Sequence, residues 1–178
     1  MKKILYFLLL FTFGLSGCEK DDICEATTPT TPRLVISFYD ILRPSIRTSV
    51  TRLKVIGEEQ PEGIVFNKNG IDESKYLISS DSIGIPLKTN NDSATFTFIL
   101  NSGSTNPALT NTDKIKINYT RQNVYVSRAC GFKTIYKLDT QKPFEITDSG
   151  NDGLWLKEVQ VQNPNIEFEN ETHVKVYF

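Results

Sequence analysis

The chain has few of the residues that build metal centres and disulfide-rich cores. Its 178 residues include one histidine, His173, and three cysteines. A lone histidine excludes His-rich metal sites and any chemistry that needs two imidazoles, and three cysteines are too few for a disulfide-rich miniprotein. The length fits one globular domain and excludes a large multidomain enzyme. We therefore expect no bound metal and no cofactor.

An excess of charge of one sign is also missing. The sequence has 20 lysine and arginine residues against 21 aspartate and glutamate residues, which gives a formal net charge of −1. Nucleic-acid-binding domains carry a basic footprint that neutralises phosphates. We therefore expect no nucleic-acid partner.

Catalytic motifs are absent as well. The sequence contains no Gly-rich phosphate loop, no Gly-x-Ser-x-Gly elbow and no His-Glu-x-x-His motif. Acid pairs such as Glu58-Glu59 are adjacent, so on a strand the two side chains would point to opposite faces. We therefore expect a protein that is not an enzyme; a hydrolase would need a buried carboxylate pair in a cleft.

One loop superficially has the pattern of a calcium site. Residues 148–153 are rich in Asp, Asn and Gly, but Gly150 occupies the third position of an EF-hand alignment and Val159 the twelfth, where acidic or amide side chains are required. A looser oxygen-ligand site remains one interpretation of this loop. The other is a turn made of residues that tolerate left-handed backbone geometry.

The first 17 residues have the pattern of a secretory signal. Lys2 and Lys3 precede the apolar run Ile4–Leu15, and small residues follow it. As a helix the run would be about 18 Å long at ~1.5 Å per residue, which is too short for a hydrocarbon core of about 30 Å. The alternative is a short buried helix, although nothing else in the chain is helical enough to pack on it.

The end of this signal resembles the bacterial lipobox. Leu15-Ser16-Gly17-Cys18 has small residues before a cysteine at the right distance from the apolar core. The resemblance implies that Cys18 is the first mature residue, with diacylglycerol on its sulfur and an acyl chain such as palmitate on its amine. Several acyl chains anchor a protein stably, because each buried methylene contributes about 0.8 kcal/mol. We expect a protein anchored by lipid in the outer membrane.

The residues after Cys18 favour exposure at the cell surface. Lys20-Asp21-Asp22 resembles the lysine-then-acids signal that directs lipoproteins of Bacteroidota to the cell surface. A solvated polar spacer is the other interpretation of these residues.

Residues 18–32 form the anchor and a polar tether. Thr-Thr-Pro occurs twice in this segment, and proline favours an extended, non-helical chain. We interpret it as a stalk or as the entry into the first strand. With Cys18 lipidated, Cys24 and Cys130 remain, and in an oxidising compartment we prefer a disulfide between them. Two free thiols, with Cys130 buried as a small apolar group, are the alternative.

Residues 33–178 read as one β-domain, because alternation of apolar and polar residues is the dominant pattern. No window of a dozen residues has sustained helical periodicity. We predict an all-β fold, an antiparallel two-sheet sandwich of Ig-like shape with about eight or nine strands. The clean alternating runs are 34–39, 94–100, 114–120, 132–138 and 173–178, and less clean strands are expected at 50–56, 83–87, 124–130 and 154–161. A hairpin is expected across Arg121-Gln122-Asn123.

A few side chains are candidate functional residues. Trp155 is either a core residue or a platform on which a sugar could stack. His173 shares the alternating face of Lys175 and is expected at the surface. Ser82 and Ser93 each follow an aspartate and precede an aliphatic or small residue, a triplet that resembles the O-glycosylation acceptor of Bacteroidota. Ordinary turn chemistry, with the aspartate capping its own backbone, explains both triplets equally well.

The whole resembles small, β-rich lipoproteins of Bacteroidota that form a domain-of-unknown-function family. The resemblance rests on the lipobox at Cys18, on Tyr119-Thr120-Arg121 and on Ala129-Cys130-Gly131-Phe132. It implies no particular activity. We expect a non-enzymatic binding or structural accessory module at the outer membrane or cell surface, with a protein or glycan partner. The alternative is a carbohydrate- or peptide-binding component of a surface uptake system.

Overall fold

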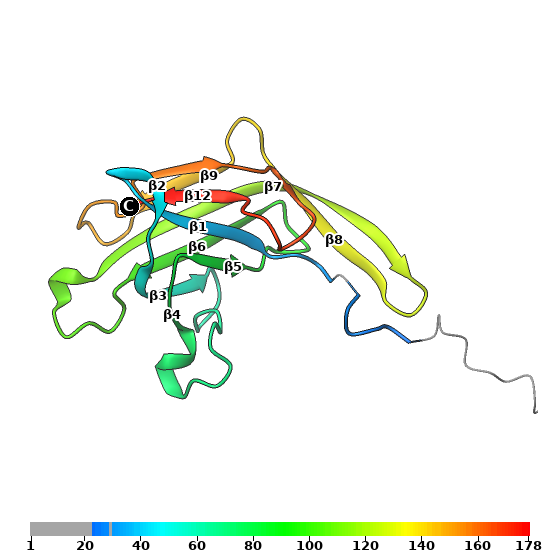
Figure 1. The fold of residues 1–178 in the computed structure, drawn as a ribbon, viewed down its shortest axis with the longest axis horizontal. Helices are drawn as coiled ribbons and strands as arrows, with labels where there is room; N and C mark the ends of the chain where they lie inside the picture. The colour runs from blue at the N-terminus through cyan, green and yellow to red at the C-terminus, as the bar shows by residue number, and fades with distance from the viewer. Residues whose placement is uncertain (1–22, 29) are drawn as a thin grey trace, which may run out of the picture.

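The computed structural model describes residues 23–28 and 30–178 (Figure 1). The lipidation predicted at Cys18 and the signal predicted at Lys20-Asp21-Asp22 lie outside these residues. Within the described part of the chain the only helical elements are two short 3-10 helices, η2 (Asp72–Tyr76) and η3 (Pro107–Leu109). No helix among these residues is long and apolar enough to cross a membrane.

In the described residues twelve strands build two sheets, which confirms the expected all-β sandwich. The first sheet has the order β10 (Glu158–Val161), β12 (Val174–Tyr177), β1 (Leu34–Asp40) and β2 (Arg43–Arg47), with β5 (Ser82–Ile85) also paired to β1. The second has the order β11 (Asn165–Ile166), β8 (Gly131–Leu138), β7 (Asn111–Ser127), β6 (Ser93–Leu100), β3 (Val50–Gly57) and β4 (Leu77–Ser80), with β9 (Phe144–Asp148) also paired to β7. Between named strands the pairing is antiparallel except for β1 with β12, which is parallel.

The core lies between the sheets and follows the alternation of the sequence. In β6 and in the first half of β7, buried residues alternate with residues that are partly or fully exposed, and β1 buries Leu34, Ile36 and Phe38 in the same way. The inward set includes Leu34, Ile36, Phe38, Ala94, Phe96, Phe98, Ile115, Ile117, Tyr119, Tyr136, Leu138, Val174 and Val176. Removing this apolar area from water is the main favourable contribution to folding.

The hairpin expected across Arg121-Gln122-Asn123 is wrong. Strand β7 runs through these residues without a break for 17 residues, and the turn to β8 lies at 128–130. All three polar side chains are exposed because this half of the strand is not covered by the other sheet. A polar run therefore marks an uncovered strand here and not a turn.

The structure contains strands that the sequence pattern did not predict. The five residues of β2 are all exposed, so no buried face imposes alternation on them. Strands β4 and β9 are short and mostly half-buried. One predicted strand is shorter than expected. Of the run 154–161 only Glu158–Val161 is a strand, because Trp155 and Leu156 are buried in an irregular segment.

His173 is buried and not on the surface, which corrects its expected position. It precedes β12, and its side chain is fully shielded from solvent. The His173 Nδ1 accepts a hydrogen bond from the Val35 backbone N–H at 2.9 Å. The His173 backbone N–H donates to the Val35 carbonyl at 3.0 Å. The side chain thus joins β1 to the start of β12, and it must be the neutral tautomer in which Nδ1 carries no proton.

We expect His173 to make stability depend on pH. Burial lowers its pKa below the usual 6.5, against the opposing effect of Glu171. The unfolded chain then binds a proton that the folded chain does not, so the free energy of unfolding should fall as pH drops below about 6.5. Denaturant titrations at pH 7.5 and 5.5 measure this, and no other histidine in the sequence contributes.

A matched pair of variants separates the proton from the hydrogen bond. In His173→Asn the side-chain oxygen can still accept from Val35, and the pH dependence between 7.5 and 5.5 should largely disappear. His173→Leu leaves the Val35 N–H unsatisfied and should cost about 1–3 kcal/mol at both pH values. An equal loss of stability on acidification in wild type and His173→Asn would contradict the assignment.

Candidate functional site

A two-stranded ribbon projects from the second sheet. Strand β6 pairs with β7 only as far as Asn118, whereas β8 pairs with β7 from Tyr119 to Ser127. Beyond this junction β7 has no described strand on its β6 side, and the two strands extend away from the sandwich (Figure 1). We call residues 122–135 the ribbon and its turn at residues 128–130 the tip.

The ribbon tip holds the predicted disulfide. Cys24 and Cys130 are bonded, with their Cα atoms 4.9 Å apart and 106 positions apart in sequence. The bond joins the start of the described chain to the part of the fold farthest along β7. The preferred pairing is therefore confirmed, and the alternative of two free thiols is wrong.

Residues 30–33 lie beside the ribbon and lead into β1. The Thr31 hydroxyl accepts a hydrogen bond from the Thr134 N–H of β8 at 3.0 Å. At the end of the segment the Arg33 guanidinium donates to both carboxylate oxygens of Glu169 at 2.5–3.0 Å, and this contact lowers the pKa of Glu169. The segment is the entry into the first strand and not a free stalk.

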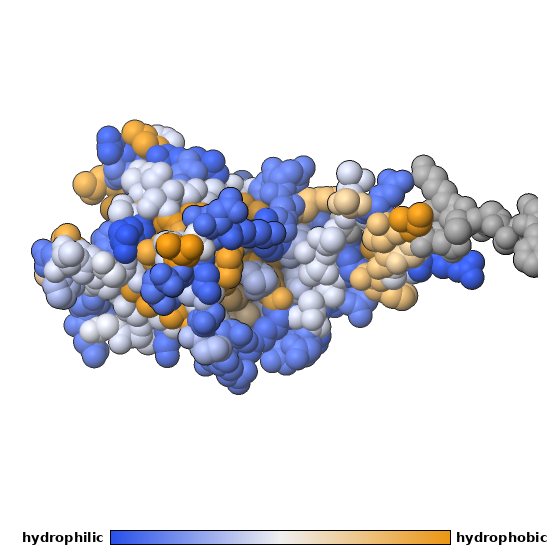
Figure 2. Space-filling view, turned by 90° about the horizontal axis from the view of Figure 1, so that it is seen from below, coloured by the Kyte–Doolittle hydropathy of each residue, from blue (hydrophilic) through white to orange (hydrophobic). Residues whose placement is uncertain are grey.

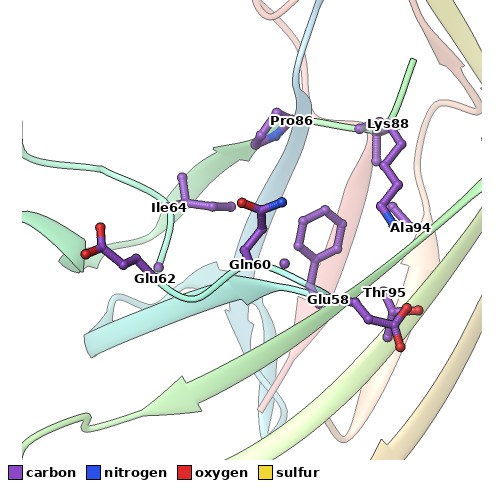
Figure 3. Close-up of a pocket in the computed structure, with 12 residues that line it drawn as sticks. Glu58, Gln60, Glu62, Ile64, Pro86, Lys88, Ala94 and Thr95 are labelled. Atoms are coloured by element: carbon purple, nitrogen blue, oxygen red, sulfur yellow. The ribbon is translucent and has the colours of Figure 1, made fainter. Parts of the chain in front are cut away.

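An open cavity of about 350 Å³ lies beside the base of the ribbon (Figure 3). Three stretches of chain surround it: the end of β3 with the loop after it, the loop between β5 and β6, and the start of β6. Its walls are Gly57, Glu58, Gln60, Glu62, Gly63, Ile64, Pro86, Leu87, Lys88, Ala94, Thr95 and Phe96. The volume is of the size that small ligands occupy in proteins.

The cavity combines an apolar base with polar groups at its mouth. Phe96 and Leu87 are almost fully buried. Gln60 extends into the space between Ile64 and Lys88, as Figure 3 shows. The Lys88 ammonium lies 3.7 Å from a carboxylate oxygen of Glu59. An amide, an ammonium and carboxylates around an apolar base suit a small ligand that carries hydroxyl or charged groups.

Two tyrosines fix one wall of the cavity. The Tyr119 hydroxyl accepts from the Lys88 N–H at 3.0 Å and donates to the Lys88 carbonyl at 3.1 Å, and the Tyr136 hydroxyl donates to the Leu87 carbonyl at 3.3 Å. Their rings meet edge to face with centroids 5.3 Å apart. Burial raises the pKa of Tyr119 to about 12, so this hydroxyl keeps its proton at neutral pH. The loop that carries Lys88 is therefore held before any ligand arrives.

Glu62 belongs to the wall but does not face the centre of the cavity. Its carboxylate accepts a hydrogen bond from the Tyr76 hydroxyl, and Figure 3 shows it directed away from Gln60. The ammonium of Lys75 lies 4.7 Å from the centroid of the Tyr76 ring. Glu62 thus supports the loop, and Glu58 and Glu59 are the acids near the mouth.

Trp155 is a core residue and not a sugar platform. It is 5% exposed, and the rings of Phe38, Phe98 and Phe178 lie around it with centroids 5.9–6.4 Å away. The buried Asp113 carboxylate accepts from the Trp155 backbone N–H at 2.8 Å, and the indole N–H donates to the Phe98 carbonyl at 3.4 Å. A stacking sugar could not reach this indole face.

The loop at 148–153 is a turn. The Asp148 carboxylate accepts from the N–H groups of Gly150 and Gly153 at 3.1 and 2.9 Å, and Asn151 and Gly153 have φ angles of 56° and 86°. The side chain thus caps its own backbone. Across the described residues, no group of three or more metal-ligating side chains is present.

The two candidate glycosylation serines lie at the starts of strands. The Ser82 hydroxyl donates to the Ile36 carbonyl at 3.1 Å and is half-buried. Ser93 begins β6 and is also half-buried, and its neighbour Asp92 pairs with Arg121 at 2.6 Å. Glycosylation of either residue stays a prediction.

The family model that matches the chain covers residues 52–178. The chain belongs to a family of unknown function, DUF6452. The matched region of this DUF6452 chain contains the cavity, the ribbon and Cys130, but not β1, β2 or Cys24. No curated protein and no solved structure matches the chain.

The cavity was not found from the sequence. Gln60, Lys88 and Phe96 come from three separate stretches, and no motif links them. One feature of the sequence lies next to the cavity. Tyr119, whose hydroxyl holds the Lys88 backbone, is part of the Tyr119-Thr120-Arg121 stretch on which the family resemblance rests.

We expect the disulfide to stabilise the ribbon more than the core. The chain-entropy model gives about 4–5 kcal/mol for closing a loop of roughly a hundred residues. Reduction, or Cys24→Ser, should cost less than this, because residues 23–32 also gain freedom in the reduced native state. Hydrogen exchange should quicken at Thr134, whose N–H bonds Thr31, while amides of β6 stay protected.

Cys130→Ser is the matched variant and should reproduce both effects. A loss of the full 4–5 kcal/mol, with uniformly faster exchange in β6 and β1, would contradict this prediction and make the bond a support of the whole sandwich.

Proposed function

We propose that this protein is a lipid-anchored lipoprotein of the outer membrane or cell surface that acts as a non-enzymatic binding or structural accessory module. The lysine-then-acids signal at Lys20-Asp21-Asp22 favours the outward-facing side. The observation that carries the proposal is the Cys24–Cys130 disulfide. Disulfides persist in exported proteins and are rare in the cytosol. This one also fastens the chain six positions after the lipobox cysteine, Cys18.

The anchor gives the protein its membrane partner. Diacylglycerol and an acyl chain on Cys18 would bury enough methylene groups for stable attachment, whereas a single chain gives only marginal binding. The domain begins close to that anchor, because the disulfide joins Cys24, six positions after Cys18, to the tip of the ribbon.

We expect Cys18→Ser to release the protein from membranes. Without the thiol no diacylglycerol can be attached, so the variant should appear in the soluble fraction and incorporate no labelled fatty acid. Cys24→Ser is the control, because it removes a cysteine and the disulfide but keeps the lipobox, and it should remain labelled and sediment with membranes. Labelled, membrane-bound Cys18→Ser would overturn the proposed anchoring.

The cavity favours a second candidate function, the binding of a carbohydrate or a peptide as part of a surface uptake system. Its apolar base and its mouth with Gln60 and Lys88, whose ammonium lies close to Glu59, fit hydroxyl-bearing or charged small molecules. The loop fixed by Tyr119 also lowers the ordering cost of binding.

We expect variants of the cavity to weaken such binding. Calorimetric titrations would use monosaccharides, disaccharides and dipeptides as probes. For a probe that binds, Lys88→Met or Gln60→Ala should weaken the affinity about tenfold or more, because each removes a hydrogen-bonding group. Lys137→Met, on the exposed face of β8, is the control and should bind as wild type does. Unchanged affinity in both cavity variants would contradict a ligand site here.

A further inference from the structure

Three large apolar side chains stand exposed together at the ribbon tip. Ile23, Tyr125 and Phe132 are 68%, 59% and 68% exposed. Tyr125 and Phe132 are directly opposite each other on β7 and β8, and their rings meet edge to face with centroids 5.5 Å apart. Figure 2 shows apolar colouring gathered at this end of the molecule, next to the grey trace. Single exposed apolar residues are ordinary, but a cluster at a projecting tip marks a contact surface.

The disulfide fixes this cluster near the start of the chain. Cys130 lies two positions before Phe132, and its partner Cys24 directly follows Ile23. Six residue steps separate Cys18 from Cys24, so their Cα atoms are at most about 20 Å apart even when the chain is fully extended. A lipid on Cys18 therefore keeps Cys24, to which the tip is bonded, within about 20 Å of the lipidated residue, and the bond prevents the ribbon from separating from that segment.

The charge around the tip suits lipid headgroups. Residues 127–133 carry Arg128 and Lys133 and no acidic residue, and the segment bonded to them adds one acidic residue, Glu25, directly after Cys24. Arg128 is exposed in the turn, and the Lys133 ammonium lies 5.2 Å from the centroid of the Phe168 ring. Aromatic rings flanked by basic groups are typical of protein segments at the membrane interface, where the rings sit at headgroup level and the cations meet phosphates.

We propose that the ribbon tip, through Ile23, Tyr125 and Phe132, inserts into the headgroup region of the membrane that holds the lipid anchor. This inference rests on the proposed lipidation of Cys18. The acyl chains and the tip form two contacts with one bilayer, so the domain stands on the membrane in one orientation. The ribbon then holds the cavity, at its base, away from the lipid surface (Figure 1).

Tryptophan fluorescence in vesicles tests the insertion. The full mature chain, lipidated at Cys18, is reconstituted into vesicles of phosphatidylethanolamine and phosphatidylglycerol, with and without lipids brominated near the headgroup. Phe132→Trp places a reporter at the tip, and Tyr125→Trp is a second reporter there. Leu42→Trp is the control, because Leu42 is 87% exposed in the turn between β1 and β2, at the other end of the molecule (Figure 1). The sole native tryptophan, Trp155, is buried and gives a constant background.

We expect the brominated lipids to quench Phe132→Trp and Tyr125→Trp several-fold more than Leu42→Trp, with a blue-shifted emission at the tip. Equal or absent quenching at both tip positions, in chains that have entered the vesicles, overturns the inference and leaves the anchoring intact. A blue shift without quenching also overturns it, because it places the tip against protein, either a second copy or a partner. A chain that does not enter the vesicles overturns the anchoring, and the insertion with it.

Discussion

The continuity of strand β7 is the constraint on which the rest of the structure depends. Its first half pairs with β6 on one edge and β9 on the other, and its inward residues fill the core. Its second half pairs with β8 alone and leaves the sandwich as the ribbon. Because one uninterrupted strand serves both parts, the direction of the ribbon is set by the sheet. The Tyr119 N–H, which bonds the Asp92 carbonyl, marks the point where one role ends and the other begins.

The same junction couples the ribbon to the cavity. Tyr119 on β7 and Tyr136 on β8 are diagonal neighbours whose rings are in contact, and together they hold the backbone of Leu87 and Lys88. Buried hydroxyls with satisfied partners make a rigid network, since leaving either partner unpaired would be costly. The wall of the cavity is thus built from the base of the ribbon. The same two tyrosines therefore belong to the base of the ribbon and to the wall of the cavity.

Sequence reasoning succeeded where one face of a strand is buried, as in Leu34–Asp40 and Ser93–Leu100. It failed where both faces meet water, because polar residues then cost nothing in a strand and read as a turn, as at Arg121–Asn123. It also misplaced His173, whose burial depends on a backbone partner, Val35, far away in sequence. The disulfide followed from counting cysteines, whereas the cavity could not be predicted, because its walls meet only through the sheet topology.

The disulfide secures the ribbon and not the packing of the core. An isolated two-stranded ribbon is marginally stable in water, and this one contributes little to the core. It is nevertheless held at its base by the Arg121–Asp92 ion pair and at its tip by the covalent bond, with the Thr31 contact between them. A crosslink intended for the core would join elements of the sandwich. The Cys24–Cys130 bond instead joins the tip of the ribbon to the start of the described chain. The bond therefore secures the part of β7 and β8 that the other sheet leaves uncovered.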